Sequence, residues 1–438
     1  MTLRRMVRLA LPAMVGSALV LGGGLRAWAA SGDLDGSFGG GDGIATQDFG
    51  GASASHGHAA LLQPDGKIVA AGSTVLPSRF DADFGVARFL SNGDPDPAFG
   101  TGGAVSTNFL GGHDVARAIL RQSDGKLVVV GDACELDDSS ACGFAVVRYL
   151  PSGKRDLSFS GDGRERIEFP GYDDLTGFNG ALMSGGKILI VGDGNKTADG
   201  QSDMVLARLN GNGSLDTTFS GDGRQTLDPS HGGDDGMSGV AIQSDGKIVG
   251  SGWAYNGSDG RWCVVRLKPN GTLDTTFSGD GVVIKNVVPG QDDYSNDLIV
   301  LPSSRILAIG RAVNAVGVST GGDVVLLRLT SGGVPDTSFG AGGLRKADFG
   351  GDEEPVSVAR DSTGRIVMSG RVGNGTGFGV FRFTAAGAPD TTFAGDGLAV
   401  EGGGALAAGI AVQGNDRPVA VGSTSQGPGD LEVARFLA

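Results

Sequence analysis

The chain has 438 residues, of which 81 are glycine, and a formal net charge of −14. Glycine at more than twice its usual share of about 7% excludes long helices, because each glycine in a helix lowers its stability. Val, Ile, Leu and Phe recur at fixed places, which excludes a disordered chain. The negative charge disfavours nucleic acid and anionic membrane surfaces as partners, so we expect no nucleic-acid ligand.

Residues 1–30 have the pattern of a signal peptide. Three arginines (Arg4, Arg5 and Arg8) precede an apolar run over 9–21, and Ala27-Trp28-Ala29 supplies the small residues that a signal peptidase reads. A membrane anchor is the alternative, but Pro12 and the glycines at 22–24 interrupt the run. No later apolar stretch is long enough to span a bilayer. We therefore expect export, by the general secretory or the twin-arginine route, to the periplasm, the cell surface or the medium.

The remaining residues, 31–438, are expected to form one domain of seven repeats. Three signatures each occur seven times. The first is D-x-x-F, with its phenylalanines at intervals of 54 to 62 residues: Phe38, Phe99, Phe159, Phe219, Phe277, Phe339 and Phe393. The second is a β-branched run that ends in glycine, at Gly72, Gly131, Gly192, Gly252, Gly310, Gly370 and Gly422. The third is a strand with one arginine, at Arg88, Arg148, Arg208, Arg266, Arg328, Arg382 and Arg435. Such a period predicts a repeat architecture.

Within one repeat, turn residues separate four short strands. Pro64-Asp65-Gly66-Lys67 lies between apolar runs over 59–63 and 68–72, and Asp-Gly there predicts a hairpin whose two central residues both take positive φ. A third strand over 83–90 leads through an Asn-Gly turn and the D-x-x-F segment to a fourth, of which 281–287 is an example. Four strands with tight turns predict one antiparallel sheet per repeat.

Seven four-stranded sheets predict an all-β, seven-bladed β-propeller. A pair of eight-stranded sandwiches or another β-solenoid is the alternative, and a linear solenoid would need polar capping repeats. The first strand of the domain, over 43–49, has no partner strands in a repeat of its own. The last repeat has only three strands, over 407–412, 417–422 and 431–437. Joining them would close the ring and remove two exposed sheet edges.

The cadence DGKIVVAG…FAVVRYLPSGxxDxSFSGDG resembles the bacterial delta-60 repeat, a propeller-type repeat of unknown function found in exported proteins. The resemblance runs from about residue 33 to 437 and is clearest over 122–163 and 243–281. The fifth and seventh copies lack the Asp-Gly pair, at 302–305 and 414–417. The resemblance implies a propeller fold and supplies no catalytic residues.

Residues that recur in every repeat are expected to build the fold. We expect Arg208 to pair with Asp216 or with the aspartate of an adjacent repeat. The D-x-x-F aromatic is expected to pack between neighbouring blades. Cys134 and Cys142 flank a short polar loop, which predicts a disulfide in an exported chain, and Cys263 is expected to be a buried hydrophobe.

Any site is expected among the residues that do not repeat. The longer loops and the acidic loops should lie at one end of the ring, where binding residues are usually found. Six aspartates in these loops are candidate calcium ligands: Asp173, Asp174, Asp234, Asp235, Asp292 and Asp293. The alternative is that they are solvated turns. His56, His58 and His113 are candidate ligands of a transition metal, with solvated polar turns again the alternative.

No H-E-x-x-H helix and no P-loop occurs in the chain. The leading interpretation is therefore a monomeric binding scaffold for an extracellular protein or a carbohydrate, with no certain cofactor and Ca²⁺ as the candidate. The alternative is a calcium-dependent, lactonase-like hydrolase, whose acids would converge at one mouth of the channel. An assignment to an enzyme class stays open, with the sequence favouring a protein without catalysis.

Overall fold

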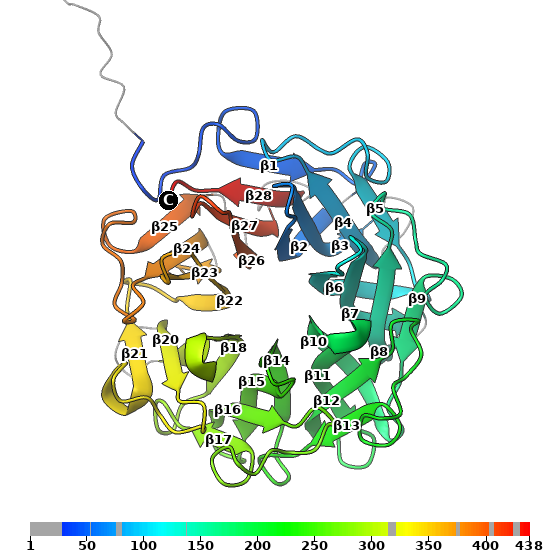
Figure 1. Cartoon of the computed structure of the whole chain (residues 1–438), viewed down its shortest axis with the longest axis vertical. Coiled ribbons are helices and arrows are strands. Elements are labelled where there is room, and N and C mark those ends of the chain that lie inside the picture. Colours follow the sequence, from blue (N-terminus) through cyan, green and yellow to red (C-terminus); the bar gives the residue numbers. More distant parts are fainter. Residues whose placement is uncertain are drawn as a thin grey trace, which may run out of the picture.

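Seven four-stranded antiparallel sheets form a ring in the computed structural model (Figure 1). It describes residues 29–52, 54–75, 81–136, 138–313, 321–373, 377–402, 407–423 and 430–438. Most of the predicted signal peptide, residues 1–28, lies outside the described residues. The predicted seven-bladed propeller is confirmed.

The blades follow the chain, each with its first strand innermost (Figure 1). Blade 1 contains β2 (Ala54–Leu62), β3 (Ile68–Val75), β4 (Ala82–Phe89) and β5 (Ala104–Thr107). Blade 2 contains β6 (Gly111–Arg121), β7 (Leu127–Glu135), β8 (Asp138–Tyr149) and β9 (Arg164–Ile167). Blade 3 contains β10 (Tyr172–Leu182), β11 (Ile188–Lys196), β12 (Ser202–Leu209) and β13 (Arg224–Leu227). Blade 4 contains β14 (Asp235–Ile242), β15 (Ile248–Tyr255), β16 (Gly260–Leu267) and β17 (Val282–Lys285).

The other three blades have the same order. Blade 5 contains β18 (Asp293–Val300), β19 (Ile306–Val313), β20 (Gly322–Leu329) and β21 (Leu344–Ala347). Blade 6 contains β22 (Glu354–Arg360), β23 (Ile366–Val372), β24 (Gly377–Phe383) and β25 (Leu398–Gly402). Blade 7 contains β26 (Ala407–Val412), β27 (Pro418–Ser423), β28 (Leu431–Arg435) and, as its outer strand, β1 (Ile44–Gln47). Three short 3-10 helices complete the elements: η1 (Ser184–Gly186), η2 (Pro302–Ser304) and η3 (Ala341–Gly343).

The ring is closed by pairing the two ends of the domain. β1 pairs antiparallel with β28, from Ile44 opposite Ala434 to Gln47 opposite Leu431, and Figure 1 shows the blue strand beside the red one. Arg435 Nε also lies 2.7 Å from Asp35 Oδ2. This confirms the predicted closure, in which one N-terminal strand completes the last blade.

The hairpin turns form where the sequence predicts them, with a different backbone geometry. In blade 1, Gly66 N donates to Gln63 O (2.9 Å) and Gln63 N donates to Lys67 O (2.8 Å). Only Gly66 has positive φ (83°), so the prediction that Asp65 also has positive φ is wrong. The turn is a three-residue loop that ends in a left-handed glycine, whereas Asp-Gly as a two-residue loop needs positive φ at both positions. In blades 5 and 7, where the glycine is missing, Ser304 (φ 56°) and Asp416 (φ 63°) occupy the left-handed position.

An arginine, an aspartate and a phenylalanine join each blade to its neighbour. In blade 3, Arg208 Nε lies 2.6 Å from Asp216 Oδ2, and the guanidinium lies over Phe219, 4.7 Å from its centroid. Arg208 Nη1 also donates to Pro269 O of blade 4. All seven blades repeat the ion pair and the stacked ring. The predicted pairing of Arg208 with Asp216 is confirmed, within its own repeat.

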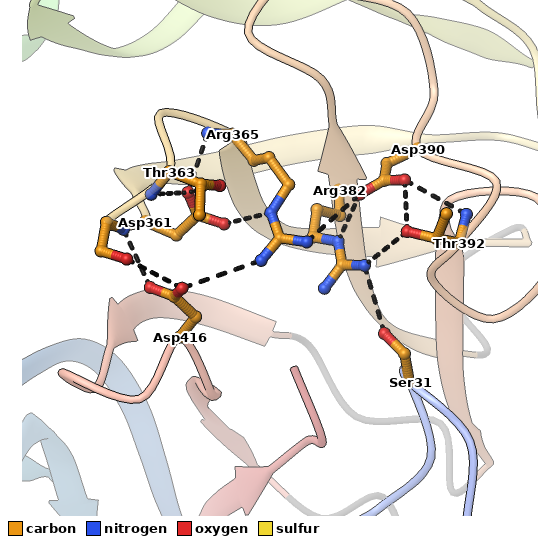
Figure 2. Close-up of polar contacts among 9 residues, drawn as sticks. Ser31, Asp361, Thr363, Arg365, Arg382, Asp390, Thr392 and Asp416 are labelled. Atoms are coloured by element: carbon orange, nitrogen blue, oxygen red, sulfur yellow. Dashed lines mark hydrogen bonds and ion pairs between the residues drawn. The ribbon is translucent and has the colours of Figure 1, made fainter.

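Figure 2 shows the polar contacts of the blade 6 copy, in which Arg382 donates to Asp390 and Thr392. Its Nη2 also donates to Ser31 Oγ at 3.2 Å, which ties residue 31 to blade 6. The phenylalanine packs between blades, as predicted: a β-carbon on Gly271 of blade 4 would lie 2.8 Å from Phe219 Cε2.

The cysteines also agree with the sequence-based predictions. Cys134 and Cys142 form a disulfide between β7 and β8. Cys263 is a buried free thiol. None of the helices in the described part of the chain is long and apolar enough to cross a membrane.

Candidate functional site: the central channel

Every innermost strand carries a β-bulge at the same place. The register shifts by one residue within β2, β6, β10, β14, β18, β22 and β26. The residues inserted at these shifts, in blade order, are His58, Arg117, Phe178, Ser238, Asn296, Val356 and Ala408. We call these seven residues the bulge ring. Bulges commonly redirect a side chain beside a functional site.

In blades 1 to 6, the recurring glycine of the second strand makes the bulge sterically feasible. A β-carbon on Gly131 would lie 1.9 Å from the carbonyl oxygen of Val115, two residues before the bulged Arg117. Gly72, Gly192, Gly252, Gly310 and Gly370 face the equivalent carbonyl at 1.7 to 2.2 Å. A side chain at this position would therefore collide with the bulged backbone. The glycine and the bulge therefore recur together.

The bulge ring surrounds a cavity of about 780 Å³ in the channel, and all seven of its residues line that cavity. The seven residues belong to seven different amino-acid types. This contrasts with the arginine, aspartate, phenylalanine and glycine that recur in every repeat. The backbone around the channel is therefore regular from blade to blade, whereas the side chains that line the channel differ.

On one side of the channel, the side chains are aromatic and charged. Arg117 Nε lies 2.7 Å from Asp132 Oδ1, and its guanidinium lies over Phe178, 5.6 Å from the centroid. Phe178 in turn meets Trp253 edge to face at 5.7 Å. These contacts place Phe178 between an ion-paired arginine and the indole of Trp253.

Trp253 reaches the channel from the second strand of blade 4. It pairs with Gly236 of β14, and a β-carbon on Gly236 would lie 2.0 Å from Trp253 Cζ2. The indole therefore crosses the inner strand over a glycine. Tyr255 and Tyr294 line the same cavity, together with the carboxylates of Asp234 and Asp292.

Two bulge residues bridge to the next blade. Ser238 Oγ donates to Ser295 O of β18 at 2.6 Å, and Asn296 Nδ2 donates to Pro355 O of β22 at 2.8 Å. Each acceptor immediately precedes the bulge residue of the next strand. On the far side, Val356 and Ala408 present small apolar groups. The channel is therefore chemically asymmetric.

Among the ionisable groups that line the cavity, His58 and Asp297 have shifted pKa values that lie between about 4 and 6. Burial, with smaller effects of Arg117 and His56, lowers the pKa of His58 to about 4, so the imidazole is neutral near pH 7. Burial raises the pKa of Asp297 to about 6, although its carboxylate accepts a 3.0 Å hydrogen bond from Val358 N. Both groups change their charge in mildly acidic solution.

The six predicted calcium ligands lie at three successive blade junctions. Asp173 is exposed, and Asp174 accepts from Asn195 Nδ2 at 3.3 Å. Asp234 and Asp292 accept hydrogen bonds from Ser202 N (3.0 Å) and Gly260 N (2.8 Å), each in the preceding blade.

The second aspartate of the later two pairs is buried. Asp235 accepts from Ser230 N at 3.1 Å, and Asp293 accepts from Val287 N at 3.0 Å. Among the described residues, no close group of three metal-ligand side chains contains members of two pairs. Calcium binding by these six residues stays a prediction, as does the hydrolase that would use it.

The histidines are placed at the inner strands. His56 and His113 are exposed, and His58 belongs to the bulge ring. The close groups of metal-ligand residues in the described ranges contain no histidine. Two such groups consist of carboxylates alone: Asp203, Asp228 and Asp235, and Asp323, Asp348 and Glu353. No residue of either trio lines the channel cavity. The acids that line it belong to neither trio.

Sequence reasoning missed the bulge ring. A signal for it existed, because a glycine that recurs inside a strand indicates a bulge or a close backbone approach. Aligning the seven first strands on that glycine's partner would have identified the variable position.

The fold and its channel define a seven-bladed β-propeller with a candidate ligand site on its axis. Five segments of the chain match a family model described as "Domain of unknown function (DUF5122) beta-propeller": residues 63–99, 122–159, 186–219, 243–277 and 301–339. Each segment runs from the first hairpin to the D-x-x-F phenylalanine of one repeat. These repeats are thus similar to a β-propeller family of unknown function.

Several solved structures resemble the chain over most of its length. A protein of unknown function from Dyadobacter fermentans DSM 18053 is 11% identical, with a TM-score of 0.46, covering 90% of this chain and 98% of that one. The polysaccharide lyase Uly1 is 10% identical, with a TM-score of 0.48, covering 90% and 92%. Extracellular domains 1–2 of Drosophila Semaphorin 1b are 11% identical, with a TM-score of 0.47, covering 93% and 87%. No curated protein matches the chain.

Proposed function

We propose that this protein is an exported β-propeller that acts as a binding module, and that its central channel receives a carbohydrate. The observation that carries the proposal is the bulge ring. Seven structurally equivalent positions converge on one cavity and present seven different side chains. A purely architectural position in a repeat protein would be free to keep one residue type, as the Arg–Asp–Phe positions do.

The cavity has the size and lining of a ligand site. Its volume of about 780 Å³ falls within the range of roughly 300–1,000 Å³ that is usual for small-molecule pockets. Such pockets combine apolar and aromatic walls with a few polar groups that fix orientation. Trp253, Phe178 and Asn296 supply both kinds of surface here.

A carbohydrate fits this lining because a sugar has apolar C–H faces and a rim of hydroxyl groups. Trp253, Tyr255 and Tyr294 offer flat aromatic surfaces for the C–H faces. Asp234 and Asp292 offer acceptors for hydroxyl groups, and Asn179 offers both a donor and an acceptor. The carboxylates are held by backbone donors of the preceding blade, so they are oriented before a ligand binds.

Export is supported by two features that do not depend on the channel. Residues 1–30 have the arginine-rich start, apolar run and small-residue site of a signal peptide. The Cys134–Cys142 disulfide is typical of an oxidising compartment.

The test is a calorimetric screen of the protein, without residues 1–30, against neutral, acidic and amino oligosaccharides. A binding sugar should also change tryptophan emission, since Trp253 lines the cavity while Trp262 is fully buried. We expect Trp253→Ala and Phe178→Ala to weaken binding at least tenfold. Val334→Ser, at an exposed position outside the cavity, is the matched control and should bind like the wild type.

Two results would overturn the proposal. One is that no sugar of the three classes binds at millimolar concentration. The other is that a bound sugar tolerates the substitutions at Trp253 and Phe178, which would place its site outside the channel.

A further inference from the structure

Three carboxylates meet where blade 3 packs against blade 4. Asp203 is the second residue of β12, Asp228 follows β13, and Asp235 begins β14. One oxygen of each lies within 4.8 Å of an oxygen of both others. Asp203 is 3% exposed and Asp235 is fully buried.

When Asp228 and Asp235 are both ionised and share no proton, one oxygen of Asp235 has no hydrogen-bond donor among the described residues. Its Oδ2 accepts from Ser230 N at 3.1 Å and from Ser230 Oγ at 2.9 Å. Its Oδ1 is buried without a hydrogen-bond partner. A buried carboxylate oxygen without a donor is costly, so this position favours a cation or a donor from outside the chain.

The same three positions recur at other junctions with different residues. Between blades 1 and 2 they are Asp83, Asn108 and Asp114, and Asn108 Nδ2 donates to Asp83 Oδ1 at 2.6 Å. Between blades 4 and 5 they are Arg261, Asn286 and Asp293, and both of the first two donate to Asp259.

Asp114 Oδ1 and Asp293 Oδ1 are also buried without a hydrogen-bond partner, so this feature belongs to the junction itself. Compared with these two junctions, the middle residue differs between blades 3 and 4, where Asp228 replaces an amide and adds a third carboxylate. The junction between blades 5 and 6 also has acids at the same three positions, Asp323, Asp348 and Glu353.

One lysine faces this cluster. Lys196 Nζ lies 2.7 Å from Asp203 Oδ1 and 3.7 Å from Asp228 Oδ2. When all three acids are ionised, a single ammonium leaves two negative charges uncompensated. Lys196 is partly exposed at the end of β11, so its side chain has room to leave.

We propose that Asp203, Asp228 and Asp235 bind a divalent cation, with Ca²⁺ the expected ion, and that Lys196 occupies the place of the ion in its absence. Calcium binds oxygens at about 2.3–2.6 Å, so two of its ligands lie at most about 5 Å apart. The spacing of at most 4.8 Å meets this condition. Because Asp203 and Asp228 belong to blade 3 and Asp235 to blade 4, the ion joins two blades.

The test uses Ca²⁺ calorimetry and the luminescence of Tb³⁺, an oxygen-binding substitute for Ca²⁺. Tyr172 OH donates to Asp203 Oδ2 at 2.5 Å, so a Tb³⁺ ion in this site is excited through the tyrosine. We expect Asp235→Asn and Asp228→Asn to lower the affinity for Ca²⁺ at least tenfold. Lys196→Met should raise it, because the competing ammonium is gone.

Asp114→Asn is the matched control, since it changes the equivalent acid at a junction with only two carboxylates. It should leave the affinity unchanged. The rise in melting temperature with Ca²⁺ should persist in this control and vanish in Asp235→Asn.

Three outcomes would overturn the proposal. They are wild-type affinity in both Asp235→Asn and Asp228→Asn, no binding by the wild type at millimolar Ca²⁺, and unchanged or weaker binding by Lys196→Met. Wild-type affinity in the two aspartate variants would direct attention to the trio of Asp323, Asp348 and Glu353. Near-ultraviolet circular dichroism tests whether the two aspartate variants are folded. If Asp235→Asn is not folded, the affinity of Asp228→Asn for Ca²⁺ alone tests the proposal.

Discussion

Trp253 lies across Gly236, so closely that a β-carbon on Gly236 would come within 2.0 Å of Cζ2 of the indole. The two residues are opposite each other on β15 and β14. The glycine lets a side chain from the second strand reach the channel, where it meets Phe178. The aromatic wall of the cavity therefore depends on a residue that contributes no side chain to it.

Gly236→Ala should displace the indole and change the emission of Trp253. Because the methyl group overpacks the site, we expect a loss of about 1–2 kcal/mol of unfolding free energy. The check is a double-mutant cycle with Trp253→Ala, in urea unfolding. With the indole removed, the alanine at position 236 should cost nothing further; an equal cost in both backgrounds would contradict the contact.

Gly131→Ala should be more severe. Its β-carbon would lie 1.9 Å from Val115 O, a backbone atom, so the bulge that presents Arg117 would have to rearrange. We expect a loss of about 3 kcal/mol, measured by urea unfolding, together with loss of ligand binding in the channel. Gly414→Ala is the control: no atom lies within 4 Å of its β-carbon position, and the change should be within about 0.5 kcal/mol.

Arg208→Met should leave Asp216 without its buried partner. Removing one member of a buried ion pair costs about 3 kcal/mol, and Arg208 additionally contacts Phe219 and Pro269. Lys187→Met removes the other cation on the same carboxylate, at 2.6 Å. That lysine is partly exposed, so its loss should cost less than about 1 kcal/mol. Comparable losses in the two variants, measured by thermal and urea unfolding, would refute this ranking.

Asp114→Asn should stabilise the protein at neutral and alkaline pH. Burial, and then the charges of Asp83 and Asp132, raise the pKa of Asp114 to about 7, against 3.8 for an unperturbed aspartate. The folded state then binds more protons than the unfolded state between these values. The wild type therefore loses stability as pH rises from about 4 to 7.

The asparagine variant lacks this loss, so at pH 8 it should exceed the wild type in unfolding free energy by on the order of 4 kcal/mol. At pH 4 the difference should disappear, since the aspartate is protonated in the folded state. Urea unfolding at pH 4, 6 and 8 measures both values. A difference that is the same at all three would exclude Asp114 as the titrating group.

The fold could be predicted from the sequence because its determinants repeat. Arg208, Asp216 and Phe219 lie within twelve residues of one another, and their equivalents occur in every blade. Ring closure could be predicted because the two incomplete ends contain the strands of one sheet. The backbone conformation of the turn at Gly66 could not be predicted, because the same Asp-Gly pair is compatible with loops of two or three residues.

The candidate site is harder to predict, for two physical reasons. A bulge inserts one residue into the alternation of inward and outward side chains along a strand. In a strand as short as β14, this insertion cannot be told from ordinary sequence variation. The trio of Asp203, Asp228 and Asp235 is assembled across a blade junction from three elements. The sequence identified Asp235 through its neighbour Asp234, but only the packing of two blades brings it to Asp203.

The pairing of β1 with β28 has a kinetic consequence. Joining Ile44 to Ala434 in an otherwise unfolded chain closes a loop of nearly the whole domain, at an entropic cost on the order of 5 kcal/mol. Once blades 1 to 6 have formed, the same two strands are already neighbours, and most of that cost has been met by local contacts. We therefore expect blade 7 to assemble last, with β28 exposed as a sheet edge only between the formation of its hairpin with β27 and the docking of β1.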